Sequence, residues 1–471
     1  MNYKIYIAVL LGLLLVTSCE EYTDIKPKGK NLLETADELE YLLNYDFNSS
    51  ASFNFFKYAI LVNDMYSYGY GQVPTVIANA NKDLEYVRLV YDEEVDRAAL
   101  TASDRNYEGL YSIISTRLNM ILEQAPNVND DPAKVEQLRA EALVLRAYLH
   151  YIVVNIYARA YDPVSASTDG GIAYMQEIDF EKSPVKSTVE EVYNFMLADL
   201  NEAIELNSLP NKPANSMRVG KAFAYAVKAK VLLSMRKYGE ALEAANSSLS
   251  IKNTYEDHRE QIGSLSFARN GMYADDNLFF ITSQDYNPTM CNVSADIYDN
   301  YYEEGNIFKE ATDIWGFPLL DQDYGLMYSG INGAALWYAP DYYQNSAGMT
   351  TADVYLIKAE CLIRTGKINE GIDVINELRE YRINPDVYSA QTATTEEDAM
   401  EVLKKVSRVE FICTWKNYVN IKRWNTEESY KETIRRDING VVYELTPESS
   451  LWVSPFPQSA TDFNENLTQN Y

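Results

Sequence analysis

Histidine is nearly absent from this 471-residue chain, which has only His150 and His258. Two imidazoles leave little material for acid–base catalysis by histidine or for a histidine-rich metal site. Basic side chains are also under-represented, with 41 Lys and Arg against 69 Asp and Glu and a formal net charge of −28. Binding to a nucleic-acid backbone needs a surface rich in Lys and Arg, so the composition argues against that class of protein.

Cysteine is scarce as well, and the three cysteines beyond the N-terminal region have no C-x-x-C spacing: Cys291, Cys361 and Cys413. Their odd number, and the apolar helical patterns around the last two, predict buried free thiols. Phosphate-binding loops, G-x-S-x-G, H-E-x-x-H and a complete EF-hand loop are missing. Asp321 and Asp323 could hold Ca²⁺, but their spacing is common in ordinary turns. We predict no catalytic residue, no metal site and no cofactor.

The apolar run near the N-terminus, residues 5–16, has 12 residues, whereas a membrane-spanning helix needs about 20. It follows Lys4 and has the features of a secretory signal. Small residues precede Cys19 directly after this run, which resembles a lipoprotein cleavage site. We predict a signal peptide over residues 1–18, lipidation at Cys19 and a lipidated tether over residues 19–30. An ordinary signal peptide with an incidental cysteine is the alternative.

Acidic residues follow the predicted lipidation site, at Glu20 and Glu21. They resemble the signal by which Bacteroidetes-type lipoproteins are displayed on the outer face of the outer membrane. The expected location is therefore the extracellular face of the cell outer membrane, with the protein anchored through Cys19. Stable anchoring of this kind depends on burying the methylene groups of more than one acyl chain.

Tyrosine is in excess, supplying 39 of the aromatic residues against 15 Phe and 5 Trp. With 47% hydrophobic residues the chain can bury a core. A core alone does not need so many hydroxyl groups, so some tyrosines are candidates for ligand contacts.

Apolar residues recur with helical spacing in many windows. We expect helices at roughly 31–44, 103–125, 132–159, 188–206, 216–236, 238–250, 351–365, 369–381 and 395–416. Ser187 with Glu190, and Thr394 with Glu397, have the spacing of capping boxes.

Part of this helical pattern repeats at an offset of 130 residues, and each copy is a helix, a tight turn and a second helix. The first copy has Tyr225, Lys228, Ala229, Leu232, Lys237, Glu240 and Asn246, and the second has Tyr355, Lys358, Ala359, Leu362, Lys367, Glu370 and Asn376. The copies resemble tetratricopeptide hairpins. We predict a mainly α fold in which such hairpins, at about 103–250 and 351–416, form a superhelical frame.

Long segments with little helical period lie between these units, at roughly 46–101, 160–185 and 251–348. Loops this long are uncommon unless they are functional. We therefore expect a loop-rich ligand-binding lobe with few short strands, carried by the helical frame.

Three segments near the C-terminus resemble a known family. Residues 352–360 (ADVYLIKAE) are similar to its "aEvyLirAEa" helix, and residues 408–411 with 421–424 (RVEF, IKRW) to its "RRxEL…fDLkRW" stretch. Residues 455–457 and 464–471 are similar to its closing "PIP…NPxLxQNPGY". With the lipoprotein signal and the helical hairpins in the same order, the chain resembles the SusD/RagB family of surface nutrient-binding lipoproteins.

The resemblance covers residues 31–471 as one SusD-like domain, with departures that indicate a divergent subgroup. Thr350 or Thr351 stands where the family usually has Arg, residues 413–415 (CTW) replace "fEG", and Asn420 replaces the Asp of "fDL". The closing Pro-Gly is also missing before Tyr471. The resemblance implies a non-catalytic protein that captures an oligomeric nutrient, usually a glycan, and closes it over a SusC-like TonB-dependent transporter.

Sugar binding needs aromatic faces for stacking and polar side chains for hydroxyl groups. The residues from 63 to 71 (NDMYSYGYG) supply Asp64, Tyr66, Tyr68 and Tyr70, and the middle of the chain supplies Trp315, Trp337 and Tyr338, with Tyr324, Tyr342 and Tyr343 as weaker candidates. For each tyrosine, packing on the helical frame is the competing interpretation. Three alternative functions stay open: a surface-anchored endo-glycosidase, a peptide-binding member of the same family, and a scaffold that binds only proteins.

Overall fold

A computed structural model of the protein describes residues 33–48, 53–68, 71–178, 183–261, 271–283, 290–338 and 344–471. The predicted signal peptide, Cys19 and the tether lie outside these residues, as do Tyr70, Tyr342 and Tyr343. Within the described ranges, no helix has both the length and the apolar composition that crossing a membrane requires.

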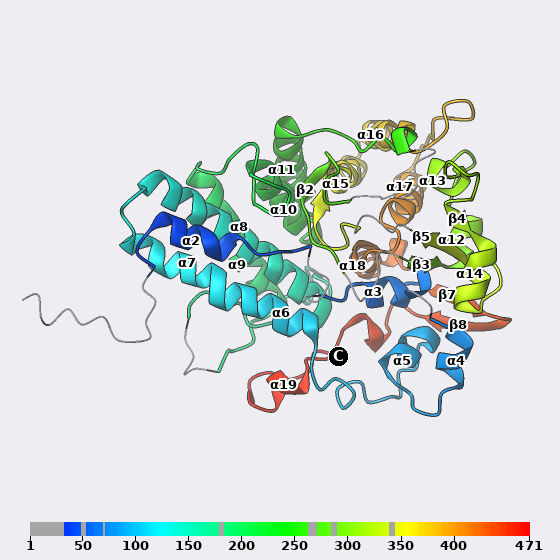
Figure 1. Ribbon diagram of the computed structural model, residues 1–471, viewed down its shortest axis with the longest axis horizontal. Helices are drawn as coiled ribbons and strands as arrows, with labels where there is room; N and C mark the ends of the chain where they lie inside the picture. The colour runs from blue at the N-terminus through cyan, green and yellow to red at the C-terminus, as the bar shows by residue number, and fades with distance from the viewer. Residues whose placement is uncertain are drawn as a thin grey trace, which may run out of the picture.

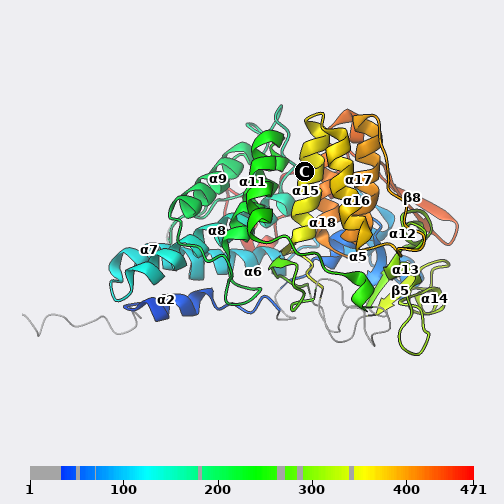
Figure 2. The ribbon, with the colours of Figure 1, turned by 90° about the horizontal axis from the view of Figure 1, so that it is seen from above.

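Most of the helical residues that the structure describes lie in two groups of helices (Figures 1 and 2). The first group contains α2 (Ala36–Leu43), α6 (Arg105–Ile113), α7 (Asn119–Gln124), α8 (Pro132–Tyr157), α9 (Val189–Glu205), α10 (Lys221–Ser234) and α11 (Tyr238–Ile251). The second contains α15 (Thr351–Arg364), α16 (Ile368–Glu380), α17 (Glu396–Glu410) and α18 (Trp415–Trp424). Helix α11 packs against α15, which joins the two groups into one frame.

The segments predicted to be loop-rich contain short helices and strands, gathered mainly at the right of Figure 1. The short helices are α3 (Phe56–Leu61), α4 (Val73–Ala78), α5 (Leu84–Val90), α12 (Ala295–Asn300), α13 (Ile307–Glu310) and α14 (Gln322–Ser329), with α19 (Gln458–Thr461) near the C-terminus. The strands are β1 (Met65–Tyr68), β2 (Asn277–Phe279), β3 (Met290–Val293), β4 (Leu320–Asp321), β5 (Ala335–Tyr338), β6 (Met349–Thr350), β7 (Ile434–Ile438) and β8 (Val441–Leu445).

The strands form three small sheets. Strands β1, β3, β5 and β4 pair in that order as an antiparallel sheet, while β2 pairs with β6 and β7 with β8. The four-stranded sheet joins the two regions that the sequence singled out for ligand binding. Strand β1 belongs to the early region, and β4 and β5 belong to the middle one.

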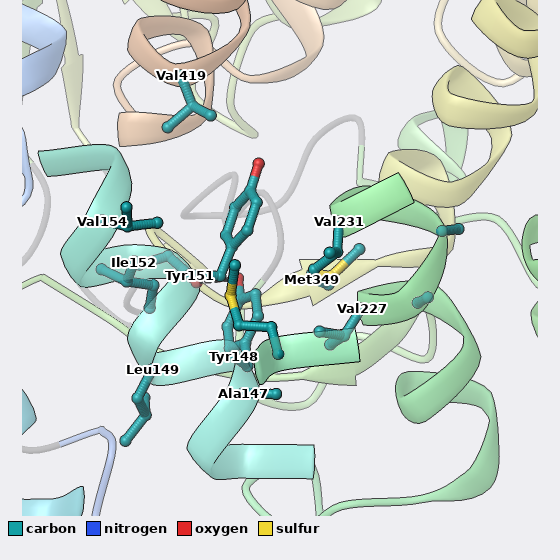
Figure 3. Close-up of a cluster of buried hydrophobic side chains, with 14 of the residues drawn as sticks. Ala147, Tyr148, Leu149, Tyr151, Ile152, Val154, Val227, Val231, Met349 and Val419 are labelled. Carbon is teal, nitrogen blue, oxygen red and sulfur yellow. Dashed lines mark hydrogen bonds between the residues drawn. The ribbon is translucent and has the colours of Figure 1, made fainter. Parts of the chain in front are cut away.

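Helix α8 forms the centre of the first helical group, and its residues from Ala140 to Tyr157 are all buried. A helix that is buried all round has to be covered on every side, and α2, α7, α9 and α10 contribute to the cover. Figure 3 shows Tyr148 and Tyr151 of α8 lying toward Val227 and Val231 of α10. The hydroxyl group of Tyr148 donates a hydrogen bond to the Ala347 carbonyl oxygen, and the hydroxyl groups of Tyr151 and Ser234 form a hydrogen bond with each other. Part of the tyrosine excess therefore serves the core.

The internal repeat is confirmed as two helical hairpins, α10–α11 and α15–α16. Their turns match as well, because Arg236 and Gly366 occupy equivalent positions and both have positive φ, at 59° and 81°. Glycine adopts this conformation freely, whereas arginine does not. The Arg236 guanidinium donates hydrogen bonds to the carbonyl and hydroxyl oxygens of Thr426, which helps to hold the turn.

Several boundaries differ from the prediction. The capping box of α9 is formed by Thr188 and Glu191, one residue later than expected, because Thr188 is the residue with extended backbone before the first helical turn. Thr395 caps α17, again one residue late. The helix expected over 395–416 divides into α17 and α18, because the intervening residue Cys413 has φ of 58°. A π-helical turn at Ile114–Leu118 separates α6 from α7 within the helix expected at 103–125.

The three described cysteines are buried thiols, as predicted. Cys361 lies in α15, Cys291 in β3 and Cys413 in the turn before α18. Burial raises the pKa of the Cys361 thiol, which favours its unreactive protonated form.

His150 in α8 gives a testable pH dependence. Its Nε2 accepts a hydrogen bond from the Met175 backbone N–H, so its Nδ1 carries the proton and donates to the Arg146 carbonyl oxygen. Burial lowers the pKa of His150 to about 3, from an ordinary value near 6.5. The unfolded chain therefore binds one more proton than the folded chain between these values. His150 thus contributes stability that is complete above pH about 6.5 and is lost as the pH falls toward 3.

We expect His150→Gln to remove this contribution, because glutamine supplies a donor and an acceptor but does not titrate. Urea unfolding of both proteins at pH about 6.5 and about 5 should show a loss on acidification that is about 2 kcal/mol larger in the wild type. An equal loss in the two proteins would show that His150 is not the group that responds.

Candidate ligand-binding surface

The described start of the early candidate region, residues 63–67, is an anchor inside the protein rather than an exposed contact. The Asp64 side chain is fully buried and pairs with the Arg408 guanidinium of α17, while Asn417 Nδ2 donates to its other oxygen at 2.8 Å. Loss of hydration on burial raises the pKa of Asp64 to about 6, and the charge of Arg408 opposes this rise. Asp64 therefore ties the start of β1 to the helical frame, and the prediction that it contacts ligand is wrong.

Tyr66 is also buried. Its hydroxyl group donates to the Asp437 carbonyl oxygen of β7 at 3.1 Å, and burial raises the pKa of Tyr66 to about 12. The neighbouring residues Met65 and Ser67 are buried as well, so both faces of β1 are covered at this position. The prediction of a ligand contact at Tyr66 is therefore wrong as well. The side chain of Tyr68, two residues on in β1, lies outside the described residues.

The prediction that Trp337 contacts ligand is also wrong, because only 1% of this residue is exposed. It lies in β5 between Cys291 of β3 and Leu320 of β4, and its ring packs edge-on against Phe308 at a centroid distance of 5.1 Å. A central position in the sheet leaves no free face for a sugar. Tyr338 follows in the same strand, and its side chain lies outside the described residues.

Trp315 has the opposite environment and is 66% exposed. It lies in a tight turn whose geometry follows from the sequence Asp-Ile-Trp-Gly-Phe. One carboxylate oxygen of Asp313 accepts hydrogen bonds from the backbone N–H groups of Trp315 at 2.8 Å and Phe317 at 3.0 Å. Gly316 supplies the positive φ, 86°, that closes the turn. The backbone groups are therefore satisfied within the turn, and the side chains of Ile314, Trp315 and Phe317 extend into solvent.

Helix α14 follows this turn after the two residues of β4. Asp321 caps its first turn by accepting from the Tyr324 N–H, which explains this carboxylate without a metal ion. The helix packs on β5 and leaves Tyr324, Leu326 and Met327 exposed. No group of three or more potential metal-ligating side chains is found among the residues that the structure describes.

Turn and helix together form what we call the exposed apolar surface: Ile314, Trp315, Phe317, Tyr324, Leu326 and Met327. These six belong to sixteen large apolar side chains that are exposed in the described ranges, so a single short segment carries over a third of them. Gln322 and Asp323 are exposed beside them on α14. Exposing so many apolar groups within one short segment favours a role in binding.

Sequence reasoning found Trp315 and Tyr324 but missed Ile314, Phe317, Leu326 and Met327. The sequence contained a signal for Ile314 and Phe317. Asp313 and Gly316 favour a turn, and the apolar residues within that turn were therefore candidates for exposure. A cavity of about 520 Å³ was also missed. Its lining combines Arg159, Asp162, Asn425, Ser450 and Tyr471, which are far apart in the sequence.

Comparison with known families decides the classification. A family described as "Starch-binding associating with outer membrane" matches residues 57–233, and the SusD family matches residues 270–471. This chain belongs to the SusD/RagB family. The resemblance carried by its C-terminal motifs is thereby confirmed, and with the family comes an association with the outer membrane.

Solved structures show the same SusD-like fold. A SusD superfamily protein from Bacteroides thetaiotaomicron VPI-5482 has a TM-score of 0.66 at 17% identity, over 93% of this chain and 100% of that chain. A SusD-like carbohydrate binding protein from Bacteroides vulgatus ATCC 8482 has a TM-score of 0.64 at 16% identity, over 92% and 97%. One from Bacteroides fragilis NCTC 9343 has a TM-score of 0.64 at 14% identity, over 93% and 100%. Among curated proteins, a search finds no significant match.

Proposed function

We propose that this SusD/RagB protein captures an oligosaccharide on its exposed apolar surface. The observation that carries the proposal is the concentration of exposed Trp315, Phe317 and Tyr324 on one turn and the helix that follows it. Rings stack on the C–H faces of sugars, while the neighbouring Gln322 and Asp323 can bond hydroxyl groups. The description of the matching family as starch-binding supports this choice, as do the related structures described as carbohydrate binding.

Rigidity of the turn favours this role. The Asp313 carboxylate fixes two backbone N–H groups and Gly316 fixes the turn, so the Trp315 ring is carried by a segment that is already organised. Binding then costs less conformational entropy than it would on an unstructured loop. Tyr68, Tyr70 and Tyr338 remain part of the proposal as further contacts.

The proposed role in the cell is delivery of the captured glycan to a SusC-like TonB-dependent transporter. In this proposal residues 1–18 are removed, Cys19 carries the lipid, and the body stands on the extracellular face of the outer membrane. The small residues before Cys19 and the acidic pair after it support this arrangement, and so does the outer-membrane association of the family. Detergent extraction of native membranes should recover a large barrel protein with this chain, and repeated recovery of the chain alone would contradict the transporter role.

A glycan screen tests the proposed activity. Purified protein without the signal peptide is expected to be retarded by some polysaccharides in affinity gels and to leave their chain length unchanged. Release of new reducing ends, abolished by one carboxylate substitution, would instead show the endo-glycosidase. Binding of peptides without glycans would show the peptide-binding alternative.

A further inference from the structure

A small pocket in the protein has an excess of positive charge. The residues that line it are distant in sequence from those of the exposed apolar surface. It lies between α3, α5, the segment 97–104 and the segment 451–455, and its volume is about 50 Å³. Space of this size holds a compact group of a few atoms rather than a sugar ring. Its charged lining consists of Lys57, Arg88, Arg97 and Asp104, three cations and one carboxylate. Such an excess is unexpected in a chain with a formal net charge of −28.

The single carboxylate is already used. Asp104 accepts a hydrogen bond from Lys57 Nζ at 2.7 Å and caps α6 by accepting from the Asn106 N–H. The pKa of Asp104 is lowered mainly by the charge and hydrogen bond of Lys57, against the opposing effect of burial. This pair is therefore neutral as a unit, and it leaves Arg88 and Arg97 without compensation from the pocket's own carboxylate.

Arg97 is held by neutral groups. Its guanidinium donates to the carbonyl oxygens of Val453 at 2.8 Å and Ser450 at 3.1 Å, and it lies over the Tyr471 ring. Only 5% of the residue is exposed, and it forms no ion pair within the described part of the chain. Burial lowers its pKa, which means that the environment disfavours the charge that arginine nevertheless keeps.

Arg88 has still fewer partners. Its guanidinium makes no hydrogen bond or ion pair with any described residue, and its buried Nε–H is left unsatisfied. The buried hydroxyl group of Tyr58, which lines the same pocket, lies near the side chains of Ser454 and Asn106 but has no partner with full hydrogen-bond geometry among the described residues. An unpaired donor in a buried site costs free energy, and an unpaired charge costs more. The charges of Glu85 and Glu93 act on Arg88 and Arg97, but neither carboxylate forms an ion pair with these two residues in the described part of the chain. The unsatisfied Nε–H of Arg88, in a pocket whose own carboxylate is already used by Lys57, therefore indicates room for a further acceptor of negative charge.

We propose that this pocket binds a compact oxyanion, a carboxylate, phosphate or sulfate group, with the Arg88 guanidinium as its main ligand. Planar guanidinium groups match such anions with paired N–H donors. Arg97, in the segment 97–104, adds positive charge to the pocket, and the Tyr58 hydroxyl group can donate a further hydrogen bond. The group has two possible sources, a free inorganic ion or the acid group of a sugar. This site is independent of the proposed stacking surface, so either proposal can fail without the other.

Calorimetric titration of the protein without its signal peptide separates these sources. The titrants are sodium sulfate, sodium phosphate, galacturonic acid and, as the neutral counterpart, galactose, at constant ionic strength. Binding of sulfate or phosphate supports the site as one for a free ion. Binding of galacturonic acid without galactose supports it as a subsite for an acidic sugar. Absence of binding by all three anions at millimolar concentration would overturn the proposal.

Variants of Arg88 identify the pocket as the place of binding. Arg88→Gln is expected to weaken anion affinity at least about tenfold, the usual effect of losing a charge-assisted hydrogen bond. Arg88→Lys keeps the charge without the paired donors and should retain part of the affinity. Arg435→Gln is the matched control, because it removes the same charge from an exposed side chain that pairs with Glu444. Equal affinity in Arg88→Gln and wild type, or equal losses in Arg88→Gln and Arg435→Gln, would contradict the assignment.

Discussion

Replacing Asp64 with alanine is expected to lower the free energy of unfolding by about 3–5 kcal/mol, as breaking a buried ion pair by removing one partner usually does. The Arg408 guanidinium would stay buried without its counter-ion, and Asn417 Nδ2 would lose an acceptor. Urea unfolding at neutral pH measures the effect. Its size would distinguish the anchoring role seen in the structure from the ligand contact suggested by the sequence.

Asp37→Ala is the matched control for this experiment. Asp37 also forms an ion pair, with Lys134 Nζ at 2.6 Å, but its side chain is 80% exposed. Exposed pairs contribute at most about 1 kcal/mol, so the control should change stability little. Equal losses in the two variants would contradict the conclusion that burial gives the Asp64–Arg408 pair its importance.

Replacing Trp315 with alanine should have the largest effect on ligand binding. We expect the affinity for a bound oligosaccharide to fall at least about tenfold, because an exposed tryptophan at the centre of an interface commonly contributes more than 1 kcal/mol. The melting temperature should hardly change, because most of the ring already contacts solvent. Phe463→Ala is the control, since it removes an aromatic ring that is 85% exposed and lies beyond α19. An equal loss of affinity in this control would point to nonspecific apolar binding.

The helical frame could be predicted from the sequence because helices leave a local signal. The repeated residues of α10–α11 and α15–α16 recur at helical spacing, and the buried stretch of α8 is rich in apolar residues over several turns. Helix ends were less certain, since Thr188 and Ser187 are both good capping residues and only the backbone conformation decides between them.

The direction of aromatic side chains could not be predicted in the same way. Trp337 and Trp315 both lie in a segment rich in turns and aromatic residues, but Trp337 is covered because β5 pairs with β3 and β4. These pairings join residues up to about fifty positions apart, and no local pattern specifies them. The exposure of Trp315 has a local origin, because Asp313 and Gly316 define its turn. The pocket around Arg88 illustrates the same limit, since four separate segments contribute to it.

The most direct test of the account compares these two tryptophans in one titration. A glycan that binds the wild-type protein is titrated into Trp315→Ala and Trp337→Phe, and the melting temperature of each variant is measured beside its affinity. We predict that Trp315→Ala loses affinity at least about tenfold and keeps its melting temperature. Trp337→Phe should keep its affinity and melt earlier, because a smaller ring leaves a void beside Phe308. Full affinity in Trp315→Ala would contradict the claim that the exposed apolar surface binds the ligand.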